Sequence, residues 1–88
     1  MRTVKYDPGP NSALDGLWLR NEHLADAIED AIDTWVREGD ERAKRRAFAG
    51  GIFAFEIRGF GEDWTVLWEV SDADGIAYIR FIGETASI

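Results

Sequence analysis

The chain contains no cysteine and only one histidine, His23. Without cysteine it can form neither disulfides nor thiolate metal sites. A single imidazole also excludes metal clusters built from several histidines, and no nucleophile signature accompanies it. We therefore expect no metal, no cofactor and no covalent cross-link.

Long apolar runs are also missing from the start of the chain. The first twenty residues contain Asp7, Pro8, Pro10 and Asp15, and they include no hydrophobic stretch. A signal peptide or a membrane-spanning helix would require one. We expect a cytoplasmic protein that makes no contact with a membrane.

Basic residues are scarce relative to acidic ones. The 88 residues include 10 lysines and arginines against 17 aspartates and glutamates, which gives a formal net charge of −7. Phosphate affinity comes largely from Lys and Arg releasing counterions, so this balance argues against nonspecific nucleic-acid binding, although a local basic site stays open. The length suits one domain, residues 1–88, and an apolar share of 45% is enough for one core.

Turn and cap residues divide the first half of the chain into a strand and helices. Residues 1–6 can form a short strand, which residues 7–11 end because they contain two prolines. Ser12 opens a helical stretch, and Asn21 offers the N-cap of the clearest helix. The apolar residues of that helix fall on one face at helical spacing: Leu24, Ile28, Ala31, Ile32 and Trp35. A short third helical segment is expected over residues 41–48.

Three strand-like runs follow, at residues 52–58, 64–70 and 76–82. Five-residue loops with glycine, 59–63 and 71–75, separate them, and hairpins commonly use loops of this length. The predicted order is therefore β-α-α-β-β-β. With the helical pair packed on one face of a curved antiparallel sheet, this is an α+β two-layer domain.

Alternation along the three runs gives the sheet two faces. One face is expected to form the core: Phe53, Phe55, Ile57, Trp64, Val66, Trp68, Val70, Ala77, Ile79 and Phe81. The other, which we call the charged face, carries Glu56, Arg58, Thr65, Leu67, Glu69, Tyr78 and Arg80. In the simplest register five of these would converge: Glu56, Arg58, Glu69, Tyr78 and Arg80.

The converging residues admit three interpretations. Arginine can stabilise charge on a phosphate and a carboxylate can act as general base, so the set has the parts needed for RNA cleavage. The same residues would serve equally as cross-strand salt bridges on a solvated sheet. The third interpretation is a surface that binds a partner.

A second candidate site is a basic segment before the strands. Arg42, Lys44, Arg45 and Arg46 make up four of the ten basic residues. They could contact phosphate or anchor an acidic partner peptide. The alternative is a solvated helix that balances the acids before it.

Several stretches of the second half carry a distinctive pattern. Residues 43–58, AKRRAFAGGIFAFEIR, form a basic segment that leads into a strand ending in Arg58. Residues 64–70, WTVLWEV, form a hairpin strand, and residues 79–83, IRFIG, end the last strand. In these motifs and in the order of its elements the chain resembles the RelE/ParE toxin superfamily of toxin–antitoxin systems.

The resemblance implies a helical pair packed against a curved antiparallel sheet. It also implies either ribosome-dependent mRNA cleavage or inhibition of DNA gyrase, held in check by an antitoxin protein. Position by position the match is uneven. Thr65 stands where RNA-cutting members place arginine, and Glu56 stands where they often place lysine. Arg58 and the basic residues 44–46 match the family pattern.

Two functional hypotheses follow. The first is a toxin component that acts on mRNA at the ribosome or on DNA gyrase. As an endoribonuclease it would use Arg58 and Arg80 for phosphate contact and Glu69 or Glu56 as base. Nucleic acid or a partner would be bound by Lys44, Arg45, Arg46 and Tyr78. The second hypothesis is a non-catalytic, acidic protein-interaction module of the same fold.

Overall fold

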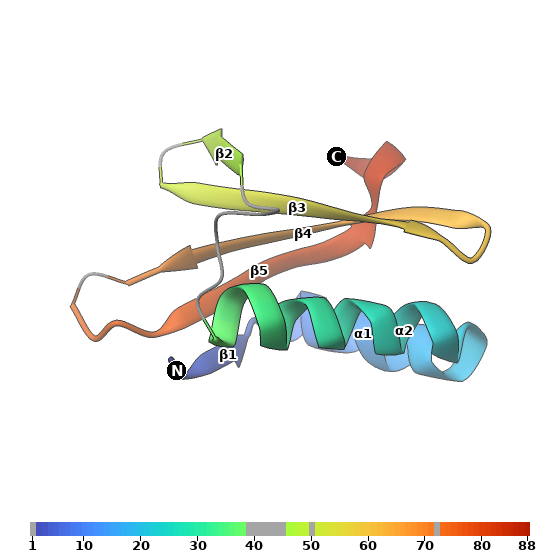
Figure 1. The fold of residues 1–88 in the computed structure, drawn as a ribbon, viewed down its shortest axis with the longest axis horizontal. Coiled ribbons are helices and arrows are strands. Elements are labelled where there is room, and N and C mark those ends of the chain that lie inside the picture. The colour runs from blue at the N-terminus through green and yellow to red at the C-terminus, as the bar shows by residue number, and fades with distance from the viewer. Residues whose placement is uncertain (1, 39–45, 50, 72) are drawn as a thin grey trace.

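The computed structural model describes residues 2–38, 46–49, 51–71 and 73–88. Its elements follow in the order β1 (Val4–Tyr6), α1 (Pro8–Arg20), α2 (Glu22–Ala31), η1 (Ile32–Arg37), β2 (Arg46–Ala49), β3 (Ile52–Gly59), β4 (Glu62–Val70), β5 (Ala77–Glu84) and η2 (Thr85–Ser87). The helices form one layer and the strands another (Figure 1). This arrangement confirms the predicted α+β two-layer class.

The strands form one five-stranded sheet in the order β1-β5-β4-β3-β2. β1 runs parallel to β5, whereas the other neighbouring strands are antiparallel. The sheet is therefore mixed, because the first strand joins it beside the last one. This pairing brings Asp7, the residue after β1, next to β5, where its backbone N–H donates to the Ile79 carbonyl (3.0 Å).

α1 begins earlier than the capping residues predict. Pro8 and Pro10 lie within its first turn and not in a preceding loop. Proline is tolerated there because the first N–H groups of a helix have no intrahelical acceptor. The predicted cap of α2 is confirmed, since the Asn21 side chain accepts a hydrogen bond from the Leu24 backbone N–H (3.4 Å).

α2 continues directly into η1, a π-helical segment of six residues. The Glu38 N–H, for example, donates to the carbonyl of Asp33, five residues earlier (2.9 Å). Val36 is fully buried in this segment, as are Ile28 and Ile32 before it, whereas Trp35 is only partly buried. No helix within the described ranges has the length and apolar character needed to cross a membrane.

The prediction of a third helical segment over residues 41–48 is wrong for residues 46–48, the part that the structure describes. Residues 46–48 belong to β2, in which Arg46 lies opposite Ala54 of β3. Residues 41–45 lie outside the described residues. A short isolated helix is marginal in water. A turn at Gly51, whose φ is +84°, instead lets β2 pair with β3 as the outermost strand of the sheet.

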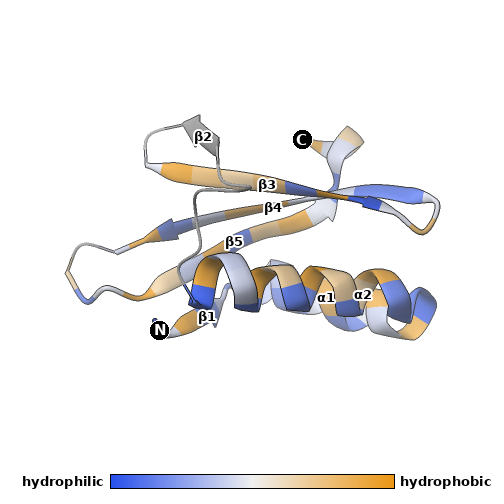
Figure 2. Ribbon diagram, in the orientation of Figure 1, coloured by the Kyte–Doolittle hydropathy of each residue, from blue (hydrophilic) through white to orange (hydrophobic). Residues whose placement is uncertain are grey.

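The core lies between the helices and the sheet. It joins both helices to the three long strands and comprises Leu14, Leu17, Leu24, Ala25, Ile28, Ala31, Ile32, Val36, Phe55, Trp64, Val66, Trp68, Ala77, Ile79 and Ile82. Figure 2 shows apolar residues spaced between polar ones along α1 and α2. The predicted core positions of Trp64 and Trp68 are confirmed.

A bulge in β5 changes which residues face the core. The β4–β5 register shifts between Leu67 and Trp68, which leaves Arg80 as the extra residue of the bulge. Beyond it the alternation is reversed. Ile82 is buried, and Phe81 pairs with Leu67 on the opposite face, where it stays partly exposed. The prediction of Phe81 as a core residue is therefore wrong.

The β3–β4 connection is shorter than predicted. β3 runs to Gly59 and β4 starts at Glu62, so that Phe60 and Gly61 alone form the turn. Their φ angles are positive, 55° and 82°, as is the 133° of Gly59. Positive φ is uncommon for a residue such as phenylalanine. Phe60 is 56% exposed, and its ring stacks on His23 with 6.2 Å between ring centroids.

Candidate functional site

The register of the sheet separates the residues of the charged face into two groups. Glu56 lies opposite Thr65, with Arg58 two residues further along β3. Glu69 lies opposite Tyr78. Thr65 and Glu69 are four residues apart on β4, which corresponds to roughly 13 Å at the usual rise of a strand. The structure therefore does not bring the five predicted residues together at one point.

Arg80 is held by two carboxylates from different elements. Its Nε donates to Glu69 Oε1 on β4 (2.7 Å). Its Nη1 donates to both carboxylate oxygens of Asp7, which precedes α1 (3.0 and 3.3 Å). The guanidinium also lies 4.6 Å from the centroid of the Tyr78 ring. The hydrogen bond to Glu69, and after it the bond to Asp7, raises the pKa of Arg80 above its ordinary value.

Tyr78 is engaged at its hydroxyl as well as at its ring. The hydroxyl donates to Asp74 Oδ2 (3.4 Å), and Asp74 Oδ1 accepts from the Ile76 backbone N–H (3.0 Å). The bond from Ile76, with smaller contributions from Ser71 and Tyr78, lowers the pKa of Asp74. Tyr78 therefore joins the Arg80 contacts to the β4–β5 loop.

The second group of the charged face consists of Glu56 and Arg58. Arg58 Nη2 donates to Glu56 Oε2 (3.2 Å), and the two side chains are 74% and 23% exposed. Thr65, opposite Glu56, is 1% exposed, and its hydroxyl lies 2.8 Å from that of Thr85 in η2. The position at which the resemblance expects an arginine is therefore buried beneath the C-terminal turn.

The basic segment is placed only at its end. Lys44 and Arg45 lie outside the described residues. The backbone of Arg46 begins β2. The roles predicted for these three residues remain predictions.

No sequence pattern indicates the polar cluster around Glu62. Its carboxylate accepts hydrogen bonds from Arg20 Nη1 (2.9 Å) and Nη2 (3.0 Å), Asn21 Nδ2 (3.0 Å) and Trp64 Nε1 (3.0 Å). These bonds, with the largest contribution from Arg20, lower the pKa of Glu62 from 4.5 to about 2. Asn21 also donates to the Phe60 carbonyl (3.4 Å). The cluster ties the α1–α2 junction to the β3–β4 turn, and only the folded chain brings these residues together.

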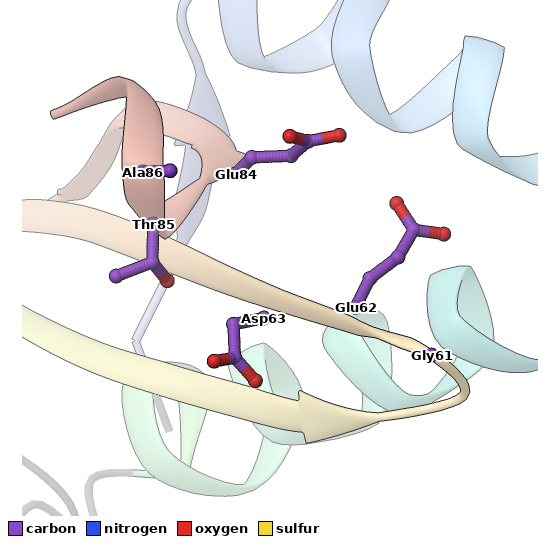
Figure 3. Close-up of a pocket in the computed structure, with 6 residues that line it drawn as sticks. All are labelled: Gly61, Glu62, Asp63, Glu84, Thr85 and Ala86. Carbon is purple, nitrogen blue, oxygen red and sulfur yellow. The ribbon is translucent and has the colours of Figure 1, made fainter.

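A pocket of about 540 Å³ lies between the β3–β4 turn and the C-terminal turn. Its lining residues are Gly61, Glu62, Asp63, Glu84, Thr85 and Ala86 (Figure 3). The Asp63 carboxylate points away from those of Glu62 and Glu84 in Figure 3. Among the residues that the structure describes, no three His, Cys, Asp or Glu side chains are grouped so as to hold a metal ion. The pocket is therefore an open acidic surface.

Comparison with known proteins identifies the fold. No protein-family model matches the chain, and no curated protein sequence matches it at a significant level. One chain of the crystal structure of the toxin–antitoxin complex RelBE2 from Mycobacterium tuberculosis superposes on it with a TM-score of 0.65. The match covers 94% of this chain and 96% of that chain at 20% sequence identity. At this identity the likeness concerns the fold and not individual residues, and it shows that the chain has a RelE-like α+β fold.

Proposed function

We propose that the chain is the toxin-like component of a toxin–antitoxin pair, and that it acts by binding a macromolecular target. On this proposal it does not cut RNA with its charged face. The observation that carries this second part is the double ion pair of Arg80 with Glu69 (2.7 Å) and Asp7 (3.0 Å). The toxin-like role is supported by the fold shared with a chain of a toxin–antitoxin complex.

RNA cleavage needs a cation that can meet a phosphate and a carboxylate that can accept a proton. The Nε and Nη1 groups of Arg80 are already bonded to carboxylates. Glu69 accepts the bond from Nε at one of its two carboxylate oxygens, Oε1. A phosphate could approach Arg80 only through its remaining N–H groups, chiefly at Nη2, and the carboxylates of Glu69 and Asp7 beside them would repel it. The contacts of Arg80 therefore support a structural role, joining β5 to β4 and to the start of α1.

The remaining residues of the charged face do not complete a nuclease site around Arg80. Glu56 and Arg58 pair with each other, at a different part of the sheet. Thr65 is buried against Thr85 and presents no cation. These features favour a protein target, such as a ribosomal protein or a gyrase subunit. An antitoxin protein would bind the chain and hold it in check, and both encounters would take place in the cytoplasm.

A ribosome-dependent endoribonuclease is the second candidate, because one observation favours it. The Arg58 side chain is 74% exposed, and within the described part of the chain its one hydrogen bond, of 3.2 Å, goes to Glu56. Its other N–H groups could meet a phosphate. In that case Arg58 would be the residue on which cleavage depends.

Inducible expression in a bacterial host tests the proposal. Growth, protein synthesis, plasmid supercoiling and mRNA 5′ ends are followed together for wild type, Arg58→Ala and Arg80→Ala. We expect growth to slow in all three strains while mRNA stays intact. Thermal melting of each purified variant shows whether its fold is retained.

Two outcomes would contradict the proposal. Fragmented mRNA in the wild type, lost together with growth arrest in a folded Arg58→Ala or Arg80→Ala variant, would establish the endoribonuclease. Normal growth at high expression would remove the toxin-like role and leave a protein-interaction module.

A further inference from the structure

A groove of about 240 Å³ lies between the helical layer and β3. It is lined by Ala27, Asp30 and Ala31 of α2, Thr34 and Trp35 of η1, and Ile57 of β3. Small-molecule sites usually occupy roughly 300–1,000 Å³. The groove is below that size, and it suits one or two side chains of another protein.

The aromatic wall of the groove is held in a fixed position. The Trp35 ring meets the ring of Phe55 edge-on, with 5.0 Å between centroids and 85° between planes. Phe55 is 2% exposed and belongs to the core. Trp35 lies at the rim of the core, while Val36, the next residue of the π-helical segment η1, takes the buried position. Pockets of this kind hold the apolar anchors that dominate protein interfaces, and π-helical turns are frequent at functional sites.

The rim of the groove is acidic. Asp30 lines it, and Asp26 lies one helical turn earlier on the same face of α2, with both side chains exposed. The helical run from residue 22 to residue 37 contains no lysine. Its one arginine, Arg37, pairs with Asp33 (3.1 Å). This charge distribution favours a basic partner and disfavours an acidic one.

We propose that this groove docks a basic amphipathic segment of a partner protein. One large apolar side chain of the segment enters between Trp35 and Ile57, and a neighbouring lysine or arginine pairs with Asp30. The inference rests on the proposed function only in taking protein binding as the activity of the chain. It does not require the chain to be toxic.

Selection from a phage-displayed library of random peptides tests the groove without a known partner. Selected peptides are synthesised with a fluorescent label, and their affinity is measured by anisotropy. We expect the binders to share a large apolar residue next to lysine or arginine. Ala27→Phe, which fills the groove, and Asp30→Lys, which reverses its rim charge, should each weaken binding about tenfold or more, because each removes an anchor contact.

Matched variants separate the groove from general effects. Asp15→Lys makes the same charge change on the exposed surface of α1, and Ala73→Phe adds the same ring to the exposed β4–β5 loop. Both should bind the peptides as the wild type does. The docking proposal is overturned if no peptide is enriched, or if enriched peptides bind Ala27→Phe and Asp30→Lys undiminished. The proposal would also be overturned if the wild type sediments as a dimer and Ala27→Phe sediments as a monomer, since a second copy of the chain would then occupy the groove.

Discussion

Arg20 at the end of α1 and Glu62 at the start of β4 lie 42 residues apart and form a two-bond contact. Nη1 donates to Oε2 (2.9 Å) and Nη2 donates to Oε1 (3.0 Å). Paired bonds between a guanidinium and a carboxylate fix orientation as well as distance. The contact therefore sets how the helical layer meets the β3–β4 turn.

Glu62→Gln should destabilise the protein in a pH-dependent way. The pKa of Glu62 is lowered from 4.5 to about 2 in the fold, so the ionised group stabilises the folded state above about pH 4.5. That stabilisation is lost as the pH falls toward 2. Chemical denaturation at pH 7 should give a lower midpoint for Glu62→Gln than for wild type, and the difference should close over this window. The exposed neighbour Asp63→Asn is the control, and equal midpoints for Glu62→Gln and wild type at pH 7 would disprove the stabilising role.

Gly83→Ala should destabilise the protein, because a Cβ there would lie 2.5 Å from Cζ of Phe81. Overpacking costs about 1–3 kcal/mol in a core, and because the partly exposed Phe81 ring can shift we expect the lower end of that range. The Phe81→Ala/Gly83→Ala double variant should lose less than the two single variants combined, since the ring causes the clash. Gly16→Ala is the matched control. Nothing lies within 4 Å of its added Cβ in α1, and it should gain about 0.5–1 kcal/mol. A Gly83→Ala variant as stable as wild type in thermal unfolding would contradict the packing of Phe81 over Gly83.

Thr65→Arg should unfold the sheet locally and not create a nuclease. The Thr65 side chain is 1% exposed and its hydroxyl pairs with that of Thr85. Burying a guanidinium there without a partner should cost about 2 kcal/mol or more. Thr3→Arg, at an exposed threonine, should change the free energy of unfolding by less than about 0.5 kcal/mol. A stable Thr65→Arg variant that cleaves RNA would show that this position belongs to an active site.

Tyr6→Phe should lose less stability than the wild type as the pH rises above 10. Burial raises the pKa of Tyr6 from 10.0 to about 12, with further contributions from the carboxylates of Glu29 and Asp33. The neutral hydroxyl is favoured in the fold, so its contribution is complete below pH 10 and falls as the pH rises toward 12. Denaturation midpoints across this range should decline less for Tyr6→Phe than for wild type or for Tyr78→Phe. The same decline in all three proteins would argue against the partial burial of the Tyr6 hydroxyl.

The fold class could be predicted because its signals are local. The helical spacing of Leu24, Ile28 and Ile32 reports burial directly. Alternation likewise gives the core face of β4, but not the burial of Thr65 on its other face. The bulge at Arg80 has no such signal. Neighbouring strands impose it, and it reverses the expected positions of Phe81 and the residues after it. The π-helical form of η1, which carries Trp35, likewise has no local signal in the sequence.

The candidate site was less predictable than the fold. Alternation placed Glu56, Glu69 and Arg80 among the residues of one face, but it could not give the register that separates Glu56 from the other two. The second carboxylate on Arg80 comes from Asp7, 73 residues away in sequence. Asp7 reaches Arg80 because β1 pairs with β5. Contacts of this range depend on the finished topology and not on any local pattern.

The most direct test of the account uses purified chain and translating ribosomes, with mRNA 5′ ends mapped by primer extension. If Arg80 is held in its ion pairs and the charged face does not cleave RNA, the mRNA will remain full length at saturating protein. Discrete cleavage that disappears in a folded Arg58→Ala or Arg80→Ala variant would contradict this account and assign catalysis to the charged face.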